Sequence, residues 1–263
     1  MKQNMNEEQN KLPQDLPVLD VEALRELDSP QLLQFAMDVQ GLLGAERARS
    51  REMEETLRKM ELTFIQTIAA VSQAIDLREA YLGGDHTGRV GIYARLIAEK
   101  MGLSILSQKE FVYSLLLHDI GNIGIAEQIL SKTDRLSGEE WDIVKRHPQI
   151  SANLISQIDF LNPALASVRS HHERWDGNGY PDGLAGEEIP LAARIIAVAD
   201  AFDAMTSDRP YRKSLAAEEA REEIRRGEGS QFDPEVVRAF DSAWDKLVAA
   251  LQKAGPPVET DLK

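Results

Sequence analysis

Helical periodicity is the feature of this 263-residue chain that most constrains its fold. Near the start of the chain, apolar residues recur at steps of three and four, with an interruption between Leu43 and Met53, and this spacing is close to that of a coiled-coil seam. The seam residues are Leu32, Ala36, Val39, Leu43, Met53, Leu57, Met60, Phe64, Ile68, Val71 and Ile75. Ser29 and Pro30 have the form of an N-cap and a first helical residue. The pattern predicts a long helix that either packs against its own domain or pairs with a second copy.

The later segments also have helical patterns. Two of them begin with Ser and Glu three residues apart, at Ser107 and Ser137, which is the capping-box arrangement. Asp233 and Pro234 open another helix, which we expect to run towards Leu251. Residues 191–205, LAARIIAVADAFDAM, contain β-branched residues but also many alanines, so we expect a helix there as well. The predicted fold class is all-α.

Charge and composition exclude several classes of partner. The formal net charge of −14 would repel a nucleic-acid polymer, although a local cluster of cations could still hold a small anion. The chain contains no run of 18 or more apolar residues, so no membrane span is predicted. Its first residues also lack the apolar stretch that a secretory signal needs. We therefore expect a cytoplasmic protein. Because the chain has no cysteine, any transition-metal ligands must be His, Asp or Glu.

All five histidines of the chain lie at predicted helix ends or beside helix breaks, where side chains can converge. Two aspartates accompany them, one directly after a histidine and one within an apolar helix. The seven side chains are His86, His118, Asp119, His147, His171, His172 and Asp200. A His-Asp pair alone would be explained by a buried histidine beside a helix-terminal carboxylate, so the argument rests on the whole set.

Seven donors are too many for one metal ion, which needs four to six ligands. Two ions that share a carboxylate would use them all, and Asp119 is the natural bridge. Nitrogen and oxygen donors suit Fe, Mn, Co, Ni or Zn without selecting among them. Two such ions would clamp a phosphodiester and activate water for in-line attack. The sequence therefore predicts hydrolysis of a phosphate ester.

The motifs HDIGNIGI (118–125), HP (147–148), HHERWDGNGYPDGLAGEEIP (171–190) and ARIIAVADAFDAMTSDRPYR (193–212) together resemble the HD-GYP family. This family comprises bacterial metal-dependent phosphodiesterases of cyclic di-GMP within the HD superfamily, and the match covers about residues 66–241. The resemblance implies a helical HD-superfamily domain, metal roles for all seven side chains, and two or three ions that are often iron or manganese. Members with three ions resemble one another in a Glu four residues before the first ligand, where this chain has Leu82. We therefore expect two ions.

The resemblance also implies substrate contacts. Arg209 and Arg212 occupy places where the family binds phosphate, although they could also belong to a solvated turn. In the family, the glycine-rich loop contacts substrate and partner proteins. Tyr180 in this loop would lie over the ions and contact a guanine ring or a phosphate, or it would only pack the loop shut. We expect positive φ angles at Gly177, Gly179 and Gly183. Glu173 and Asp176 could stiffen this loop, and Asp203 could orient a ligand histidine.

One departure from the family concerns catalysis. The family usually reads HDIGKIGI, and Asn122 occupies the place of its lysine. Losing this cation would slow the reaction by a factor on the order of 10²–10³, by analogy with other single-donor losses. The leading hypothesis is hydrolysis of cyclic di-GMP to pGpG, with GMP as an optional end product. The alternatives are another cyclic dinucleotide or nucleotide as substrate, and a signalling module without activity that binds the messenger or a partner protein through residues 175–190.

The expected organisation has four parts. Residues 1–28 are polar and acidic, which predicts a loosely held arm. Residues 29–65 form the N-terminal helical segment, through which a homodimer could assemble. Residues 66–254 form the HD-GYP catalytic domain, and residues 255–263 form a frayed tail.

Overall fold

The computed structural model describes residues 28–78, 85–104, 108–208 and 213–254. The expected arm up to residue 27, the expected tail, Leu82, Ser107, Arg209 and Arg212 therefore lie outside the described residues. The chain divides into two compact units, residues 1–62 and 63–263. The limits expected from the sequence, at residues 28, 65 and 254, stay a prediction.

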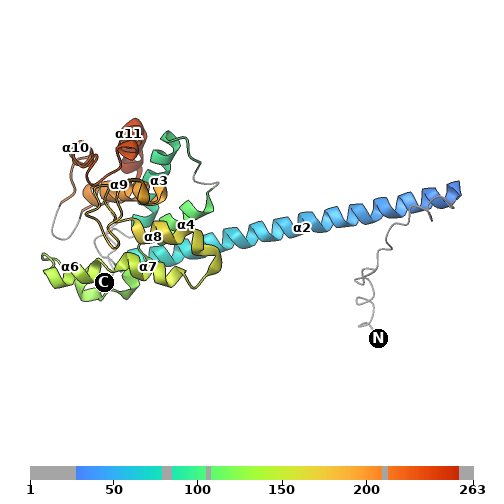
Figure 1. Cartoon of the computed structure of the whole chain (residues 1–263), viewed down its shortest axis with the longest axis horizontal. Coiled ribbons are helices and arrows are strands. Elements are labelled where there is room, and N and C mark those ends of the chain that lie inside the picture. The colour runs from blue at the N-terminus through green and yellow to red at the C-terminus, as the bar shows by residue number, and fades with distance from the viewer. Residues whose placement is uncertain (1–27, 79–84, 105–107, 209–212, 255–263) are drawn as a thin grey trace. The chain divides into compact units, whose positions relative to one another are not determined.

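Every regular element in the described ranges is a helix, so the predicted all-α class is confirmed (Figure 1). The α-helices are α2 (Ser29–Asp76), α3 (His86–Lys100), α4 (Lys109–Leu117), α5 (Glu127–Leu130), α6 (Gly138–Val144), α7 (His147–Ile155), α8 (Leu165–Ser170), α9 (Leu191–Thr206), α10 (Ala217–Arg226), α11 (Pro234–Ser242) and α12 (Trp244–Ala254). The 3-10 helices are η3 (Ile120–Gly124), η4 (Asp159–Ala164) and η5 (Gly186–Glu188).

Helix ends largely follow the predicted caps. Ser137 and Glu140 form the expected capping box, with hydrogen bonds of 3.2 and 2.7 Å between each backbone N–H and the opposite side chain. At α2 the predicted cap was wrong by one residue, because Asp28 rather than Ser29 accepts the N–H of residue 31. The helix opened by Asp233 was expected to continue to Leu251, and it instead ends at Ser242.

The break after Ser242 has a tertiary cause. Trp244 begins a new helix and packs its ring 6.0 Å from Phe202 and 5.8 Å from Phe240, measured between ring centroids. Its indole N–H donates to a carboxylate oxygen of Glu218 at 3.0 Å. No glycine or proline marks this turn in the sequence.

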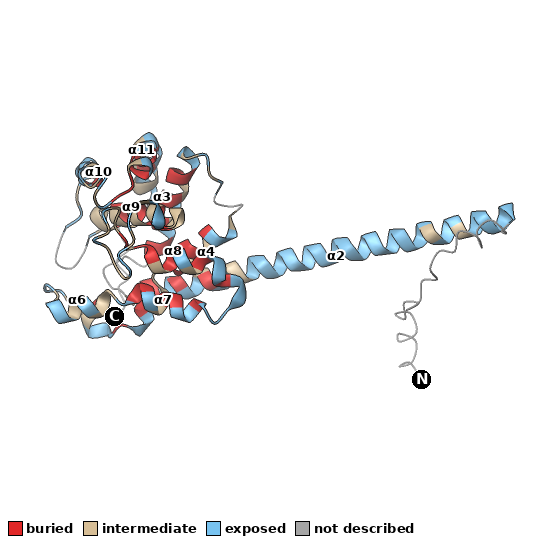
Figure 2. Cartoon of the chain, viewed as in Figure 1, coloured by how far each residue is buried: buried red, intermediate tan, exposed pale blue. Residues whose placement is uncertain are grey.

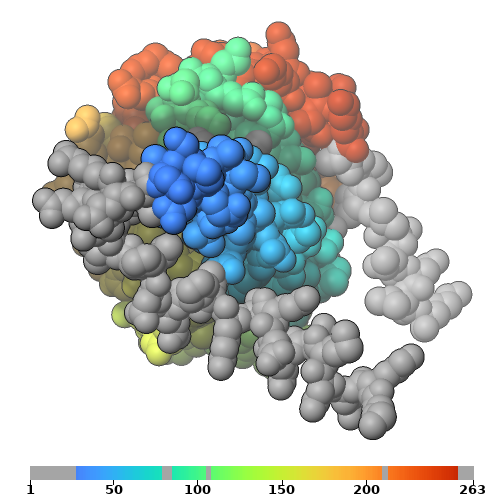
Figure 3. Space-filling view, turned by 90° about the vertical axis from the view of Figure 1, so that its right-hand side faces the viewer, coloured from blue at the N-terminus to red at the C-terminus, as the bar shows by residue number. Residues whose placement is uncertain are grey.

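The larger unit has two hydrophobic cores, which appear as red segments in Figure 2. The first joins α3 and α9 to the three C-terminal helices, and Figure 3 shows α3 beside those helices at the surface. The second joins α4, η4 and α8 to the last turns of α2, where the ring of Phe64 packs at 4.4 Å from that of Phe160. The C-terminal turns of α2 therefore pack against their own domain, whereas no residue from 28 to 62 is buried.

Candidate metal centre

The structure brings the seven candidate ligands together from five parts of the fold. His86 opens α3, His147 opens α7, and Asp200 lies in α9. The others lie where α4 and α8 end. The atoms available to a metal form two overlapping groups, and within each group they lie within 4.8 Å of one another. One group contains Asp119, His147, His171 and His172, and the other contains His86, His118 and Asp119.

Asp119 belongs to both groups and presents one oxygen to each. Its Oδ2 lies 3.6 Å from Nε2 of His86 and 3.5 Å from Nε2 of His118. Its Oδ1 lies 3.1 Å from Nε2 of His147 and 3.5 Å from Nε2 of His171. Asp200 joins the group of His86 and His118, because its Oδ1 lies 3.5 Å from Nε2 of His86. A single carboxylate thus separates two sets of imidazoles.

Three of the histidines have their tautomer fixed by the backbone. His118, His147 and His171 each donate Nδ1–H to the carbonyl oxygen three residues earlier, at 2.8, 2.8 and 2.7 Å. A carbonyl oxygen can only accept, so Nδ1 carries the proton and Nε2 keeps its lone pair. Histidines that bind metals are typically oriented by such bonds. All three Nε2 lone pairs therefore face the cluster.

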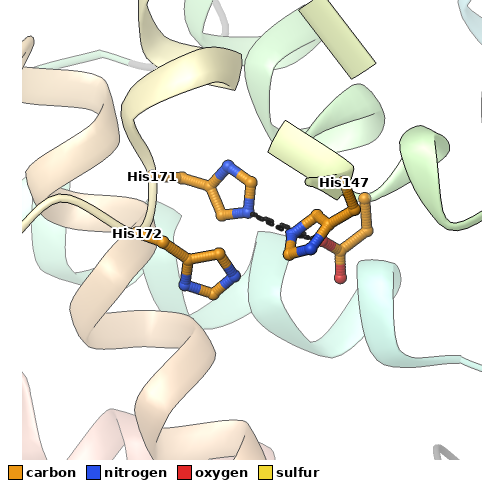
Figure 4. A group of neighbouring side chains, drawn as sticks. His147, His171 and His172 are labelled. Atoms are coloured by element: carbon orange, nitrogen blue, oxygen red, sulfur yellow. Dashed lines mark hydrogen bonds and ion pairs between the residues drawn. The ribbon is translucent and has the colours of Figure 1, made fainter. Parts of the chain in front are cut away.

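These lone pairs show how well the site would suit a cation. The Nε2 atoms of His147 and His171 lie 3.1 Å apart, and Figure 4 shows their rings turned toward each other. Two lone pairs at that distance repel unless a proton or a metal ion lies between them. In the same cluster, Nε2 of His118 is buried without a hydrogen-bond partner. Buried polar atoms normally have partners, so these nitrogens fit a site for metal ions.

The electrostatics around Asp119 and His172 also suit metal binding. Burial opposes ionisation of Asp119, but the imidazoles around it, that of His118 foremost, hold the pKa of its carboxyl well below the ordinary value. Burial, followed by the neighbouring imidazoles, lowers the pKa of His172 well below its usual range. An ionised Asp119 and a neutral His172 are in the protonation states that a metal ion requires.

His86 is held differently from the other histidines. Its Nδ1 donates to Oδ2 of Asp203 at 2.8 Å, so the carboxylate proposed to orient a ligand makes that hydrogen bond. Burial alone would lower the pKa of His86, but the bonds to Asp119 and Asp203 raise it well above the ordinary value. Binding a metal ion at its Nε2 would therefore release a proton.

Gly121 and Ser151, which sequence reasoning missed, join two ligand-bearing segments. The Ser151 hydroxyl accepts the N–H of Gly121 and donates to the carbonyl of His118, both at 2.8 Å. A Cβ at Gly121 would lie 2.1 Å from the carbonyl oxygen of His147, so only glycine allows this approach. The glycine after His-Asp was the available signal, but its neighbour Ser151 lies 30 residues away.

The glycine-rich loop is braced by its own acidic residues, as predicted. Oε1 of Glu173 accepts the N–H groups of Asp182 and Gly183 at 2.7 and 3.0 Å. Asp176 accepts the N–H of Asn178 at 3.0 Å. Arg169 of α8 binds both oxygens of Asp182, at 2.6 and 2.7 Å. These contacts fix the loop against the helix that ends at His171.

The glycines of this loop serve two purposes. Gly177 and Gly183 have φ angles of +78° and +71°, as expected. The expected positive φ at Gly179 is wrong. A Cβ at Gly179 would lie 2.3 Å from the backbone nitrogen of Arg174, so close packing of two chain segments requires glycine there.

Of the residues predicted to contact substrate, the structure describes Tyr180 and Asn122. Tyr180 packs against His172, with ring centroids 5.0 Å apart and an interplanar angle of 31°. Burial raises the pKa of Tyr180, so its phenol stays protonated. This position beside a candidate ligand suits either a substrate contact or loop packing. Asn122 lies in η3 and is 5% exposed.

The class of protein that follows is a helical domain with a cluster of histidines and aspartates that could bind metal ions. A model of the HD domain family matches residues 65–236, and the chain belongs to this family. The resemblance seen in the motifs is therefore confirmed. Across the described helices, none is long and apolar enough to cross a membrane.

Curated relatives share much of the sequence. A cyclic di-GMP phosphodiesterase of Thermotoga maritima is 46% identical over 157 residues, 59% of this chain and 43% of the relative. A 3'3'-cGAMP-specific phosphodiesterase of Vibrio cholerae is 32% identical over 228 residues, 86% of this chain and 42% of the relative. This chain thus spans less than half the length of either protein.

A solved structure supports the fold. An HDGYP protein from Bdellovibrio bacteriovorus superposes with a TM-score of 0.51 at 18% identity, covering 62% of this chain and 52% of that one. At this identity the similarity concerns the fold alone, which agrees with the family assignment.

Proposed function

We propose that this chain hydrolyses cyclic di-GMP to pGpG, with GMP as a further product, at a centre of two divalent ions, most simply iron or manganese. The observation that carries the proposal is the place of Asp119, with one carboxylate oxygen toward each set of imidazoles. The Thermotoga maritima relative, which is named a cyclic di-GMP phosphodiesterase, supports the choice of substrate.

The residues divide between the two proposed ions. His86, His118 and Asp200 with Oδ2 of Asp119 would hold one ion. His147, His171 and His172 with Oδ1 of Asp119 would hold the other. A pair of divalent ions supplies charge neutralisation for the phosphate and activation of water. The backbone carbonyls that accept the Nδ1 protons keep the imidazoles turned inward throughout.

The chain's other residues would hold the substrate. Tyr180, fixed beside His172, would stack against a guanine ring or donate its phenol proton to a phosphate oxygen, since its raised pKa keeps it protonated. Arg209 and Arg212 would each fork onto phosphate oxygens. Asn122 would offer an amide hydrogen bond where the family has a charge. The proposal thus predicts a functional but slow enzyme.

Turnover measured by chromatography tests the proposal. Protein loaded with Mn²⁺ or Fe²⁺ under reducing conditions should convert cyclic di-GMP to pGpG, and His171→Ala should abolish the conversion. Ser156→Ala changes an exposed residue at the C-terminal cap of α7 and is the matched control. Binding of cyclic di-GMP without turnover would instead favour a signalling module without activity, the alternative suggested by Asn122 in place of the family's lysine.

A second substrate has its own support. The Vibrio cholerae relative that matches most of this chain is named for 3'3'-cGAMP. Parallel assays with both dinucleotides at equal concentration decide between them, because kcat/KM should be larger for the true substrate. A homodimer through α2, a protein partner at residues 175–190 and a cytoplasmic location remain predictions of the same proposal.

A further inference from the structure

Arg89 makes a buried connection to the cluster that the proposed reaction does not use. Its Nε donates to Oδ1 of Asp203 at 2.7 Å, and its Nη2 donates to Oδ2 at 3.0 Å. Nη2 also lies 3.3 Å from the hydroxyl of Ser207. Asp203 is fully buried, and the guanidinium is 13% exposed. A two-bonded fork of this kind fixes both the position and the plane of the carboxylate.

The fixed carboxylate in turn holds a candidate ligand. Oδ2 of Asp203 accepts Nδ1–H of His86, while Asp200, one turn earlier on α9, faces Nε2 of the same ring. Arg89 and His86 are likewise one turn apart on α3. Two helices therefore each supply one candidate ligand and one supporting group, and His86 lies between two carboxylates.

The other histidines do not depend on this connection. His118, His147 and His171 donate Nδ1–H to carbonyls of their own or the preceding helical turn. These acceptors are part of the backbone, and a side-chain substitution at Arg89 leaves them in place. Among these four histidines, only His86 is oriented by a side chain, that of Asp203, which is itself fixed by Arg89.

We infer that Arg89 is a positioning residue that sets the occupancy of one of the two ion sites, the one formed by His86, His118, Asp119 and Asp200. The inference rests on the proposed dinuclear centre. Without the fork, the buried carboxylate of Asp203 keeps no basic side-chain partner but His86 among the described residues, and it can rotate away from Nδ1. The imidazole then no longer holds Nε2 toward Asp119. Loss of such a supporting group typically costs 10–100-fold in metal affinity.

Metal content tests this without recourse to activity. Wild type, Arg89→Met and Arg95→Met are loaded with Mn²⁺, desalted and analysed for manganese per chain, and their EPR spectra are recorded. Arg95 lies on the same helix, is 42% exposed and pairs only with Glu99 among the described residues, so it is the matched control. We expect two ions with a spin-coupled spectrum in wild type and Arg95→Met. Arg89→Met should hold about one ion and give an uncoupled spectrum.

The outcomes separate the inference from the proposed function. Two ions in Arg89→Met overturn the inference and leave the dinuclear centre intact. Fewer than two ions in wild type overturn both. If Arg89→Met does not fold by circular dichroism, Arg89→Lys replaces it, because lysine keeps the charge but cannot fork. It should lower Mn²⁺ affinity at one site by about tenfold or more, whereas a merely structural role would lower the Tm and leave both affinities unchanged.

Discussion

Asp76 and Thr87 join the last turn of α2 to the first turn of α3. The carboxylate of Asp76 accepts the backbone N–H and the hydroxyl of Thr87 at 2.9 and 3.0 Å. One turn earlier, the hydroxyl of Ser72 donates to the carbonyl of Leu116 near the end of α4. Thr87 directly follows one candidate ligand, and Leu116 lies two residues before another. The end of α2 therefore supports two segments of the metal centre.

Removing the carboxylate should destabilise the domain more than removing one of its donors. Asp76→Ala leaves two buried donors without an acceptor and should lower the free energy of unfolding by about 2–3 kcal/mol. Thr87→Val removes only the hydroxyl and should cost about 1 kcal/mol. Urea unfolding of the metal-free proteins measures both values. Equal losses in the two variants would show that the backbone bond contributes nothing.

Chelation of metal should lower thermal stability, because the facing Nε2 atoms of His147 and His171 repel each other without a cation. An ion present at 100 times its Kd stabilises the folded state by about 2.7 kcal/mol. For a unit of this size that corresponds to a Tm shift of about 5–10 °C. Differential scanning fluorimetry with and without EDTA measures it. His147→Ala, which lacks one of the facing nitrogens, should show a smaller shift, and an unchanged Tm in wild type would contradict the metal site.

Substitutions of Asp119 and of Asp200 should remove different amounts of bound metal. Asp119 faces both imidazole sets, so Asp119→Asn should hold almost no metal after desalting. Among the candidate ligands, Asp200 pairs only with His86, so Asp200→Asn should retain about one ion per chain. Elemental analysis of both variants, loaded identically, gives the comparison. Equal metal content in the two proteins would rule out a bridging role for Asp119.

Much of this architecture could be predicted from local patterns. The alanine-rich residues 191–205 form α9 because helix propensity agrees with the burial of one face, even though β-branched residues interrupt the alanines. The convergence of the histidines followed from their places at helix ends. Asp203 could be proposed as a supporting group because it lies one turn past Asp200, on the same face of the helix.

Other features depend on contacts between distant segments and could not be predicted. The pairing of Gly121 with Ser151 requires the approach of η3 to α7, which no local pattern encodes. The fork of Arg89 on Asp203 joins residues 114 positions apart. The break before Trp244 arises from an aromatic cluster assembled from α9 and α11. In each case the tertiary fold decides which side chains meet.

The predicted seam of α2 should mediate self-association. Met53, Leu57 and Met60 occupy its steps and are 60%, 53% and 64% exposed in the single chain. In a parallel pair, the heptad that these residues define would place Arg49 of one copy near Glu54 of the other, so charge also favours pairing. Leu57→Asp should convert a dimer to a monomer in sedimentation velocity.

Leu62 provides the control for the seam. It is 56% exposed but lies off the three- and four-residue steps, so Leu62→Asp should leave the dimer intact. A wild-type monomer at micromolar concentration, or equal effects of the two substitutions, would contradict pairing through this helix.

Restoring the charge at position 122 should accelerate the proposed reaction. Asn122 occupies the place of the family's lysine, so in the proposed reaction a lysine there would restore the missing cation. Single transition-state contacts of this kind are worth on the order of 10²–10³ in rate, and we expect Asn122→Lys to raise kcat at least tenfold with an unchanged metal content. Because the site is 5% exposed, the unliganded variant should also melt at a lower temperature than wild type, and cyclic di-GMP should recover part of the loss. Asn122→Met has similar length without charge and should show no acceleration. Equal rates for the lysine and methionine variants would mean that charge at this position does not limit turnover.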